Sequence, residues 1–318
     1  MTGRKEMDAK FKARIENRLK NYPEYLSGYY YARTRTSIRT NCTYINIIAK
    51  FLDNLKKPIN EVNRKDIDEY LYVMNGEDKS THKATTCTAL KSFFKYLESV
   101  GEIASNPMAD IERPRVLRDE NERVDYLTED EIKQYLRAVH NGAGNWLALK
   151  RQETMRSRDI AMIMMFLCTG MRCSALNELN IDDLDFENNS ITITTKGQKK
   201  KVYNGLQDVF EYIKEYLKTR EQYVNADCNA LFITKRGQRI SYSAIQETVT
   251  KYAVNINGKR ITPHKLRATY ATTLYNNGVD LLTLKDLMGH ANIETTKVYI
   301  RGRENKTADA ANIMSKFL

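Results

Sequence analysis

Apolar residues recur at helical spacing through the first third of the chain, and no alternating strand pattern interrupts them. A charged amphipathic helix is predicted over residues 1–22. Asn63 is a predicted N-cap, and a long helix opens at Ser80 and Thr81 and ends at Gly101. We therefore expect residues 23–112 to be all-helical. Three apolar stripes support this prediction: Met7, Phe11, Ile15 and Leu19; Tyr44, Ile47, Ile48, Phe51, Leu52 and Leu55; Leu90, Phe93, Phe94 and Leu97.

The second half of the chain mixes helices with a short sheet. Thr128 and Glu131 have the spacing of a capping box, and residues 157–179 predict a buried helix, a turn at Gly170 and a further helix. Alternation predicts an antiparallel pair, with Ile191, Ile193 and Thr195 on one strand and Val202 on the return. Further helices are expected at 207–223 and 242–254, and LFITKRGQRIS predicts a strand and a turn.

At 318 residues the chain exceeds what one hydrophobic core usually supports, so two domains are expected. Pro107, Pro114 and mixed charges indicate a linker over residues 113–124. The predicted organisation is an N-terminal helix at 1–22, a helical domain at 23–112, a second domain at 125–305 and a tail at 306–318. The fold class is mainly α (α+β). The tail has an apolar helical face that must fold back or dock on a neighbouring subunit.

Charge narrows the range of partners. Lysine and arginine outnumber aspartate and glutamate by 51 to 40, which gives a net charge of +11 and favours a polyanion. Nucleic acid is favoured over an acidic membrane or a ribosome. Neither a membrane span nor a signal peptide is indicated, so a cytoplasmic protein is expected. The five cysteines are scattered and support neither a disulfide framework nor a zinc site.

Candidate chemistry concentrates between Pro263 and Tyr299. His264 lies three residues before Arg267, and His290 lies nine before Tyr299. Arginine clamps a phosphate, histidine exchanges a proton near neutral pH, and a tyrosine hydroxyl can act as a nucleophile. Together they indicate phosphoryl transfer without a metal ion. Each residue alone is more often a helix cap, a surface cation or a half-buried aromatic.

Other cations lie outside this stretch. Arg172 follows the apolar helix directly, where a charge needs a partner or a ligand unless it is simply solvated. A lysine cluster marks the predicted hairpin tip and could sit in solvent or meet a phosphate chain. Basic residues of the first domain could grip DNA or form a solvated face. The first set is Lys196, Lys199, Lys200 and Lys201, and the second is Arg33, Arg35, Arg39 and Lys50.

Five short motifs together resemble the tyrosine recombinase (phage integrase) family. They are TGMR with Arg172, TKGQKKK with Lys196, HKLR with His264 and Arg267, MGH with His290, and KVY with Tyr299. Their order matches the family, as do the intervals of 23 and nine residues that follow Arg267 and His290. The resemblance implies a DNA breaking-rejoining enzyme fold. The block at 35–112 is similar to the family's core-binding domain, and LTEDEI to the start of its catalytic domain.

The resemblance also implies a mechanism. Tyr299 would attack a scissile phosphate of double-stranded DNA, giving a 3′-phosphotyrosine and a free 5′ hydroxyl. Arg172 and Arg267 would clamp the nonbridging oxygens, and His290 would donate to the same anion. His264 would accept the tyrosine proton, and Lys196 would protonate the departing oxygen. No metal, ATP or other cofactor is implied. Exchange between two recombination sites implies a homotetramer, with accessory proteins as further partners.

The sequence departs from the family pattern at a few positions. Ala175 stands where an acidic residue usually follows the first arginine, and Ala268 where many members carry a second histidine. Neither Asn177 nor Glu178 is an obvious substitute for that acid. Four readings remain open: integration or transposition of a mobile element, Xer-like resolution of DNA dimers, a catalytically weak site-specific DNA-binding protein, and a type IB topoisomerase.

Overall fold

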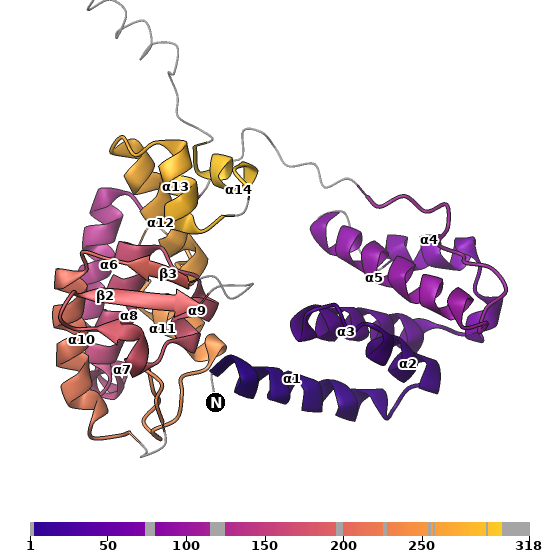
Figure 1. Ribbon diagram of the computed structural model, residues 1–318, viewed down its shortest axis with the longest axis horizontal. Coiled ribbons are helices and arrows are strands. Elements are labelled where there is room, and N and C mark those ends of the chain that lie inside the picture. Colours follow the sequence, from indigo (N-terminus) through magenta and orange to yellow (C-terminus); the bar gives the residue numbers. More distant parts are fainter. Residues whose placement is uncertain are drawn as a thin grey trace, which may run out of the picture. The chain divides into compact units, whose positions relative to one another are not determined.

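The computed structural model describes residues 3–73, 80–114, 125–194, 200–224, 228–253, 256, 258–290 and 292–300. The chain divides into two compact units, Met1–Asp119 and Glu120–Leu318. Figure 1 shows both units, with helices predominating in each. In the described part of the chain, no helix is both long and apolar enough to cross a membrane. The mainly helical fold with one small antiparallel sheet confirms the predicted fold class.

The described part of the first unit is all-helical. The core gathers aromatic rings from α2, α3 and α5, including an edge-on contact between Phe51 and Phe94. Asn63 caps its helix as predicted, because its side chain accepts from the amide of Lys65 at 2.9 Å. The elements are α1 Gly3–Leu19, α2 Glu24–Ala32, α3 Ile38–Asn54, the 3-10 turn η1 Ile59–Glu61, α4 Arg64–Val73 and α5 Ser80–Ser99.

Helix α1 belongs to this core. Ile15 and Leu19 are buried in the same apolar cluster as the residues of α3, against which α1 packs. A charged amphipathic helix of this kind has three possible arrangements, namely lying on DNA, packing on a neighbour, or fraying. Packing on α3 is the observed one.

In the second unit, helix α8 lies in the main hydrophobic core, with other helices packed around it. Five apolar side chains of α8 are fully buried, and α6, α10, α11 and α12 pack on it. The predicted capping box of Thr128 and Glu131 is present at α6. The helices are α6 Glu129–Asn141, α7 Trp146–Glu153, α8 Arg156–Thr169, α9 Cys173–Glu178, η2 Ile181–Asp183, α10 Gln207–Arg220, α11 Tyr242–Lys251, α12 Pro263–Asn276, α13 Leu281–Met288, α14 Glu294–Lys297 and η3 Val298–Ile300.

Three antiparallel strands form the sheet in the order β1, β2, β3, with bounds Leu184–Asp185, Ser190–Thr194 and Lys200–Tyr203. Lys201 pairs with the buried Ile193, so it lies on the inward face, whereas Val202 lies on the opposite face and is 49% exposed. The strand predicted in LFITKRGQRIS is wrong, because that segment forms only an isolated bridge, Ile233 with Arg239, on the two sides of the predicted turn.

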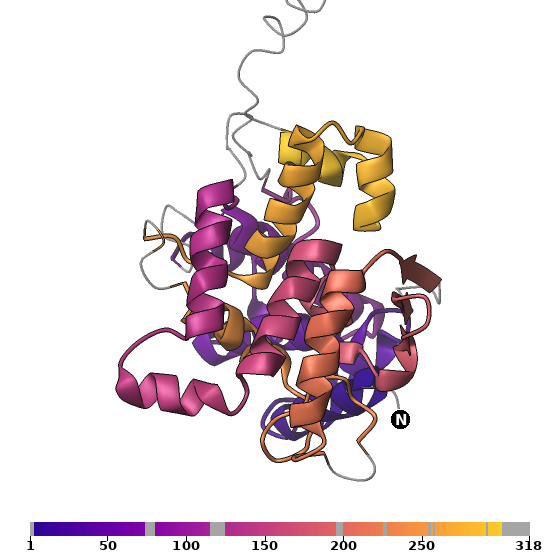
Figure 2. The same cartoon turned by 90° about the vertical axis from the view of Figure 1, so that its left-hand side faces the viewer.

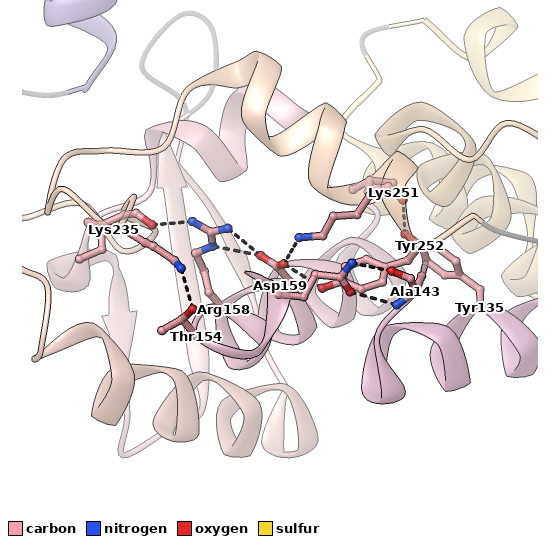
Figure 3. A network of polar contacts seen from close by, with 11 residues as sticks. Tyr135, Ala143, Thr154, Arg158, Asp159, Lys235, Lys251 and Tyr252 are labelled. Carbon is pink, nitrogen blue, oxygen red and sulfur yellow. Dashed lines mark hydrogen bonds and ion pairs between the residues drawn. The ribbon is translucent and has the colours of Figure 1, made fainter. Parts of the chain in front are cut away.

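A buried carboxylate ties α8 to α11. Asp159 is fully buried, and Arg158 donates to its Oδ1 from Nε at 3.0 Å and Nη2 at 2.8 Å. Lys251 and Tyr252 donate to Oδ2 at 2.5 and 2.9 Å. Figure 3 shows Arg158 and Lys251 approaching Asp159 from opposite sides. The negative charge is thus compensated, which is the condition for keeping a carboxylate in a protein interior.

A separate small core joins α12, α13 and the 3-10 turn η3. Ala268 and Ala271 of α12 pack with Leu284 and Met288 of α13 and with Tyr299. Figures 1 and 2 both show α12, α13 and α14 gathered at one end of the second unit. This packing brings Arg267, the end of α13 and the segment that carries Tyr299 together.

Candidate active site

Arg267 occupies the centre of the site. Helix α12 begins with Thr262 as N-cap and Pro263 in its first turn, which places Arg267 one turn inside, only 4% exposed. Its Nη1 donates to the carbonyl of Gly170, and its Nη2 donates to the carbonyl of Met288 at 2.6 Å. Burial, and then the charge of Arg172, lowers the pKa of Arg267. Loss of hydration therefore disfavours the charged form of Arg267, and an anion bound to the guanidinium would offset this cost.

The carbonyl of Gly170 is within reach because the chain turns sharply at that residue. Gly170 ends α8 in the left-handed conformation with φ 57°. A Cβ at this position would lie 2.3 Å from the ring of Tyr270. Glycine is thus required both for the backbone conformation and for the close approach of α12.

His290 is held in one tautomer. The Nη2 of Arg267 lies 2.9 Å from its Nε2, and because a guanidinium only donates, Nε2 must accept. The proton is then on Nδ1, which donates to Oγ1 of the fully buried Thr296 at 2.9 Å. Burial, and then the charges of Arg267, Arg172 and Lys201, lowers the pKa of His290 to about 4. Sequence reasoning did not identify Thr296, since nothing local distinguishes it from any helix-start threonine.

Tyr299 adjoins both of these residues. Its ring lies nearly parallel to that of His290, with centroids 6.1 Å apart and 17° between the planes. The side chain is 7% exposed and belongs to the small core of α12 and α13. Tyr299 also partly offsets the lowering of the Arg267 pKa, first through charge and then through a hydrogen-bonding interaction. The structure therefore brings Tyr299, His290 and Arg267 together.

Arg172 and His264 lie at the rim. Arg172 is the exposed N-cap residue of α9, and its Nη2 lies 3.5 Å from the carbonyl of Gly289. His264 is in the first turn of α12 and is exposed, yet reduced solvation, and then the charges of Arg267 and Arg172, lowers its pKa. It is close enough to lower the pKa of His290 as well. No hydrogen bond joins it to Tyr299 among the described residues.

Two of the four lysines of the predicted hairpin, Lys200 and Lys201, are among the described residues. Lys196 and Lys199 lie outside the described residues, and Lys200 is exposed at the start of β3. Lys201 points inward: its Nζ donates to the carbonyl of Leu287 and lies 4.3 Å from the ring centroid of Tyr203. Burial, and then the charges of Arg267 and Arg172, lowers the pKa of Lys201 to about 8. Strand alternation was the available signal, because Lys201 and Tyr203 share a face.

No ion pair neutralises this cluster within the described part of the chain: Arg172, Lys201 and Arg267 have no carboxylate partner there. Ala175 carries no charge, and Asn177 turns away to donate to the carbonyl of Ile240 at 2.6 Å. The site therefore holds an excess of positive charge in a partly desolvated position. Such an arrangement suits a bound anion.

The basic residues of the first unit differ in their surroundings. Arg33 is engaged internally, donating to Asn41 at 3.0 Å and Ser92 at 2.6 Å and lying 4.6 Å from the ring centroid of Tyr44. Arg39 lies over the ring of Phe11 at 5.8 Å. Arg35 and Lys50 are exposed. Of the four, Arg33 thus stabilises the contact between α2, α3 and α5.

Comparison with known proteins identifies the class. The phage integrase family matches residues 125–306, and the phage integrase N-terminal SAM-like domain matches residues 29–100. A tyrosine recombinase XerC of Caldanaerobacter subterraneus subsp. tengcongensis is 32% identical over 260 residues, covering 80% of this chain and 69% of the relative. A tyrosine recombinase of Thermosipho africanus is 29% identical over 296 residues, covering 90% and 97%.

Solved structures agree in fold. XerH recombinase bound to palindromic difH substrate, in a post-cleavage complex, has a TM-score of 0.67 at 22% identity, covering 87% of this chain and 80% of that one. The Tn1549 transposon integrase in complex with circular intermediate DNA has a TM-score of 0.66 at 22% identity, covering 91% and 98%. The chain belongs to the phage integrase family of tyrosine recombinases, enzymes that cut and rejoin DNA.

Proposed function

We propose that the site performs strand exchange through a covalent bond between Tyr299 and a DNA 3′-phosphate. The oxygen of Tyr299 forms the new bond to phosphorus while the bond to the 5′ oxygen breaks. His264 takes the tyrosine proton, and Lys196 supplies a proton to the departing oxygen. The observation that carries the proposal is the buried Arg267, which has no carboxylate partner among the described residues and lies beside His290 and Tyr299.

The two arginines stabilise the negative charge of the phosphate. Arg267 and Arg172 bind the nonbridging oxygens, and each well-placed donor contributes about 10²–10³-fold to the rate. In the DNA-free state His290 is neutral and its Nε2 accepts from Arg267. A phosphate at this position favours protonation of His290, so that Nε2 becomes a donor to the anion.

Formation of a covalent adduct tests this proposal. A randomised duplex library is selected on Tyr299→Phe, and a recovered duplex is nicked beside the cleaved position so that the released end is lost. The expected product is a denaturation-resistant adduct with the wild-type protein and none with Tyr299→Phe. An adduct that persists in that variant would overturn the assignment of Tyr299. Binding without an adduct would favour a catalytically weak DNA-binding protein.

The leaving group tests Lys196. A 5′-bridging phosphorothiolate expels a thiolate, which needs no protonation. Lys196→Ala should therefore cleave the oxygen substrate slowly and the sulfur substrate at nearly the wild-type rate. Lys199→Ala is the matched control: at saturating protein, where weaker DNA binding has no effect on the rate, it should cleave both substrates at the wild-type rate. A Lys196→Ala defect that sulfur does not relieve would assign Lys196 another role.

We further propose that recombination takes place in a homotetramer on two duplexes in the cytoplasm, with tail 306–318 as the subunit contact. Mixing two labelled duplexes with protein lacking the tail should give single-duplex complexes only.

Exposed Arg35, Arg39 and Lys50 of the first unit, with Lys199 and Lys200, are proposed as phosphate contacts. Neutralising any one should weaken binding and reduce its salt dependence.

Two biological roles fit this chemistry. Integration or excision of a mobile element is the first, and Xer-like resolution of DNA dimers is the second, which the XerC-named relatives support. Mapping the selected duplex onto the host genome separates them. A pair of sites flanking one segment favours the mobile element, and a single site per replicon favours the resolver. Relaxation of any supercoiled plasmid without a site would favour a type IB topoisomerase instead.

A further inference from the structure

In the C-terminal turn of α13, each backbone carbonyl from Lys285 to Gly289 accepts a hydrogen bond. The last carbonyls of a helix have no partner within the helix. Gly289, with φ 60°, reverses the chain so that the amides of His290 and Gly289 donate to the carbonyls of Lys285 and Asp286, each at 3.0 Å. This is the backbone pairing of a Schellman motif. Three carbonyls remain, those of Leu287, Met288 and Gly289.

Each remaining carbonyl accepts from a different cation. Lys201 of β3 donates to Leu287. Arg267 of α12 donates to Met288 at 2.6 Å, and Arg172, at the start of α9, donates to Gly289 at 3.5 Å. Three elements far apart in sequence thus converge on one helix end. That end has the negative pole of the helix dipole, about half an elementary charge.

None of these three cations has a carboxylate partner in the described part of the chain. We propose that the C-terminal turn of α13 positions the anion-binding side chains in place of a carboxylate, and that Lys201 is the positioning residue that ties the β2–β3 hairpin to it. The proposal rests on the proposed function. Partial negative charge on carbonyls orients a cation without neutralising it, so the cation remains available to a phosphate.

Lys201 is well placed for this role. It shares the inward face of the sheet with Tyr203 and pairs with the buried Ile193, so moving its side chain to the opposite face would require a change of strand register. In the sequence, Lys196 lies between β2 and β3, outside the described residues. Fixing β3 against α13 therefore also fixes the position of Lys200, four residues after Lys196.

The hydrogen bond from Lys201 to the carbonyl of Leu287 depends on pH. Arg267 of α12, Arg172 before α9, His290 after α13 and Tyr203 of β3 all face Lys201 or influence its charge. Its pKa of about 8 means that the ammonium is largely lost between pH 7 and pH 9. A neutral amine binds a carbonyl more weakly, so the hairpin should be held less firmly above pH 8.

Amide hydrogen exchange of the DNA-free protein tests the contact between Lys201 and the C-terminal turn of α13. Lys201→Met should exchange the amides of Gly289 and His290 about ten-fold faster than wild type, because the local opening of that turn becomes easier. Lys201→Arg keeps a charged donor and should resemble wild type. Lys200→Met removes the neighbouring, exposed lysine and serves as the matched control. Wild-type exchange in Lys201→Met would overturn the proposal, whether or not the protein cleaves DNA.

Cleavage of the nicked duplex tests the consequence. Lys201→Met should form the Tyr299 adduct about 10–100-fold more slowly at pH 7, with duplex affinity nearly unchanged. The ratio of the Lys201→Arg rate to the wild-type rate should rise as pH passes 8, because arginine keeps its charge. A flat ratio would overturn the positioning role, since a purely structural contact does not predict that rise. Absence of any wild-type adduct would instead refute the proposed function and leave the exchange result to decide.

Discussion

Two clusters of buried charge in the second unit show opposite designs. Around Asp159, one fully buried carboxylate is met by Arg158, Lys251 and Tyr252. Around Arg267, the partners are backbone carbonyls and a neutral histidine. The first cluster is complete by itself and holds α8 to α11. The second has positive charge in excess, which raises its energy in the free protein and its affinity for an anion.

Removal of Arg267 should have the largest effect. Arg267→Ala takes away two donors near the phosphate, so the rate of adduct formation should fall by at least about 10³-fold. Arg239→Ala is the matched control, because Arg239 also donates to carbonyls, those of Asn177 and Leu179, both at 2.9 Å. Single-turnover assays should show no comparable loss in the control. Equal losses would mean that Arg267 acts only through structure.

Removal of Asp159 should reverse the pattern. Asp159→Ala leaves Arg158 and Lys251 uncompensated, and the free energy of unfolding should fall by about 3–5 kcal/mol. Adduct formation by the folded fraction should stay within about two-fold of wild type, because the two clusters are independent. Urea denaturation, with cleavage assayed at low temperature, measures both. A stable but inactive variant would remove the distinction between the clusters.

The next largest effect is expected in the pH dependence of stability, to which His290 of the Arg267 cluster contributes. The pKa of His290 is about 4 in the folded protein and about 6.5 when unfolded, so the unfolded state binds more protons between these values. Stability should therefore fall as pH drops from 6.5 towards 4. His290→Gln should lose less stability over that range than wild type. Parallel curves for the two proteins would contradict the lowered pKa.

Anion binding should give a smaller effect. If the cluster around Arg267 accepts an isolated anion, sulfate at ten times its Kd should stabilise the protein by about 1.4 kcal/mol. Arg267→Gln should abolish this increment, whereas Asp159→Asn should keep it. Thermal unfolding at constant ionic strength, with chloride as reference, provides the measurement. The same increment in both variants would indicate nonspecific salt stabilisation.

A carboxylate introduced near the cations should give the smallest effect. Ala175→Glu places an acid in the first turn of α9, three residues after Arg172. Stability should rise by about 0.5 kcal/mol, from the helix dipole and the nearby cations. Ala175→Gln matches its shape without the charge. If only the glutamate variant forms adduct faster, then the carbonyls of α13 orient the cations less completely than an acid does.

The sequence predicted local features better than those that depend on register. The caps at Asn63 and Thr128 and the turn at Gly170 were predicted because their signals lie within a few residues. Alternation within β3 groups Lys201 with Tyr203, but only the pairing with Ile193, which requires both strands, identifies their shared face as the inward one. The internal engagement of Arg33 depends on Ser92, 59 residues away.

The candidate site shows the same limit more sharply. Motif spacing brought forward Arg267, His290 and Tyr299, and the structure places these three together. The acceptors that orient the cations are backbone carbonyls, and every residue type carries one. No side-chain pattern could therefore point to Leu287 or Met288. Sequence reasoning instead registered only the missing carboxylate at Ala175.

Orientation by backbone has a consequence for mutational tolerance. A carboxylate that positions an arginine can be lost by one substitution, whereas a carbonyl remains whatever side chain is attached. Lys285, Asp286 and Leu287 should therefore accept varied replacements, while Gly289, at φ 60°, and the buried Met288 should not. Selection on this segment would act on the helix ending rather than on residue identity. The last turn of α13 could then diverge widely between active recombinases while its geometry is retained.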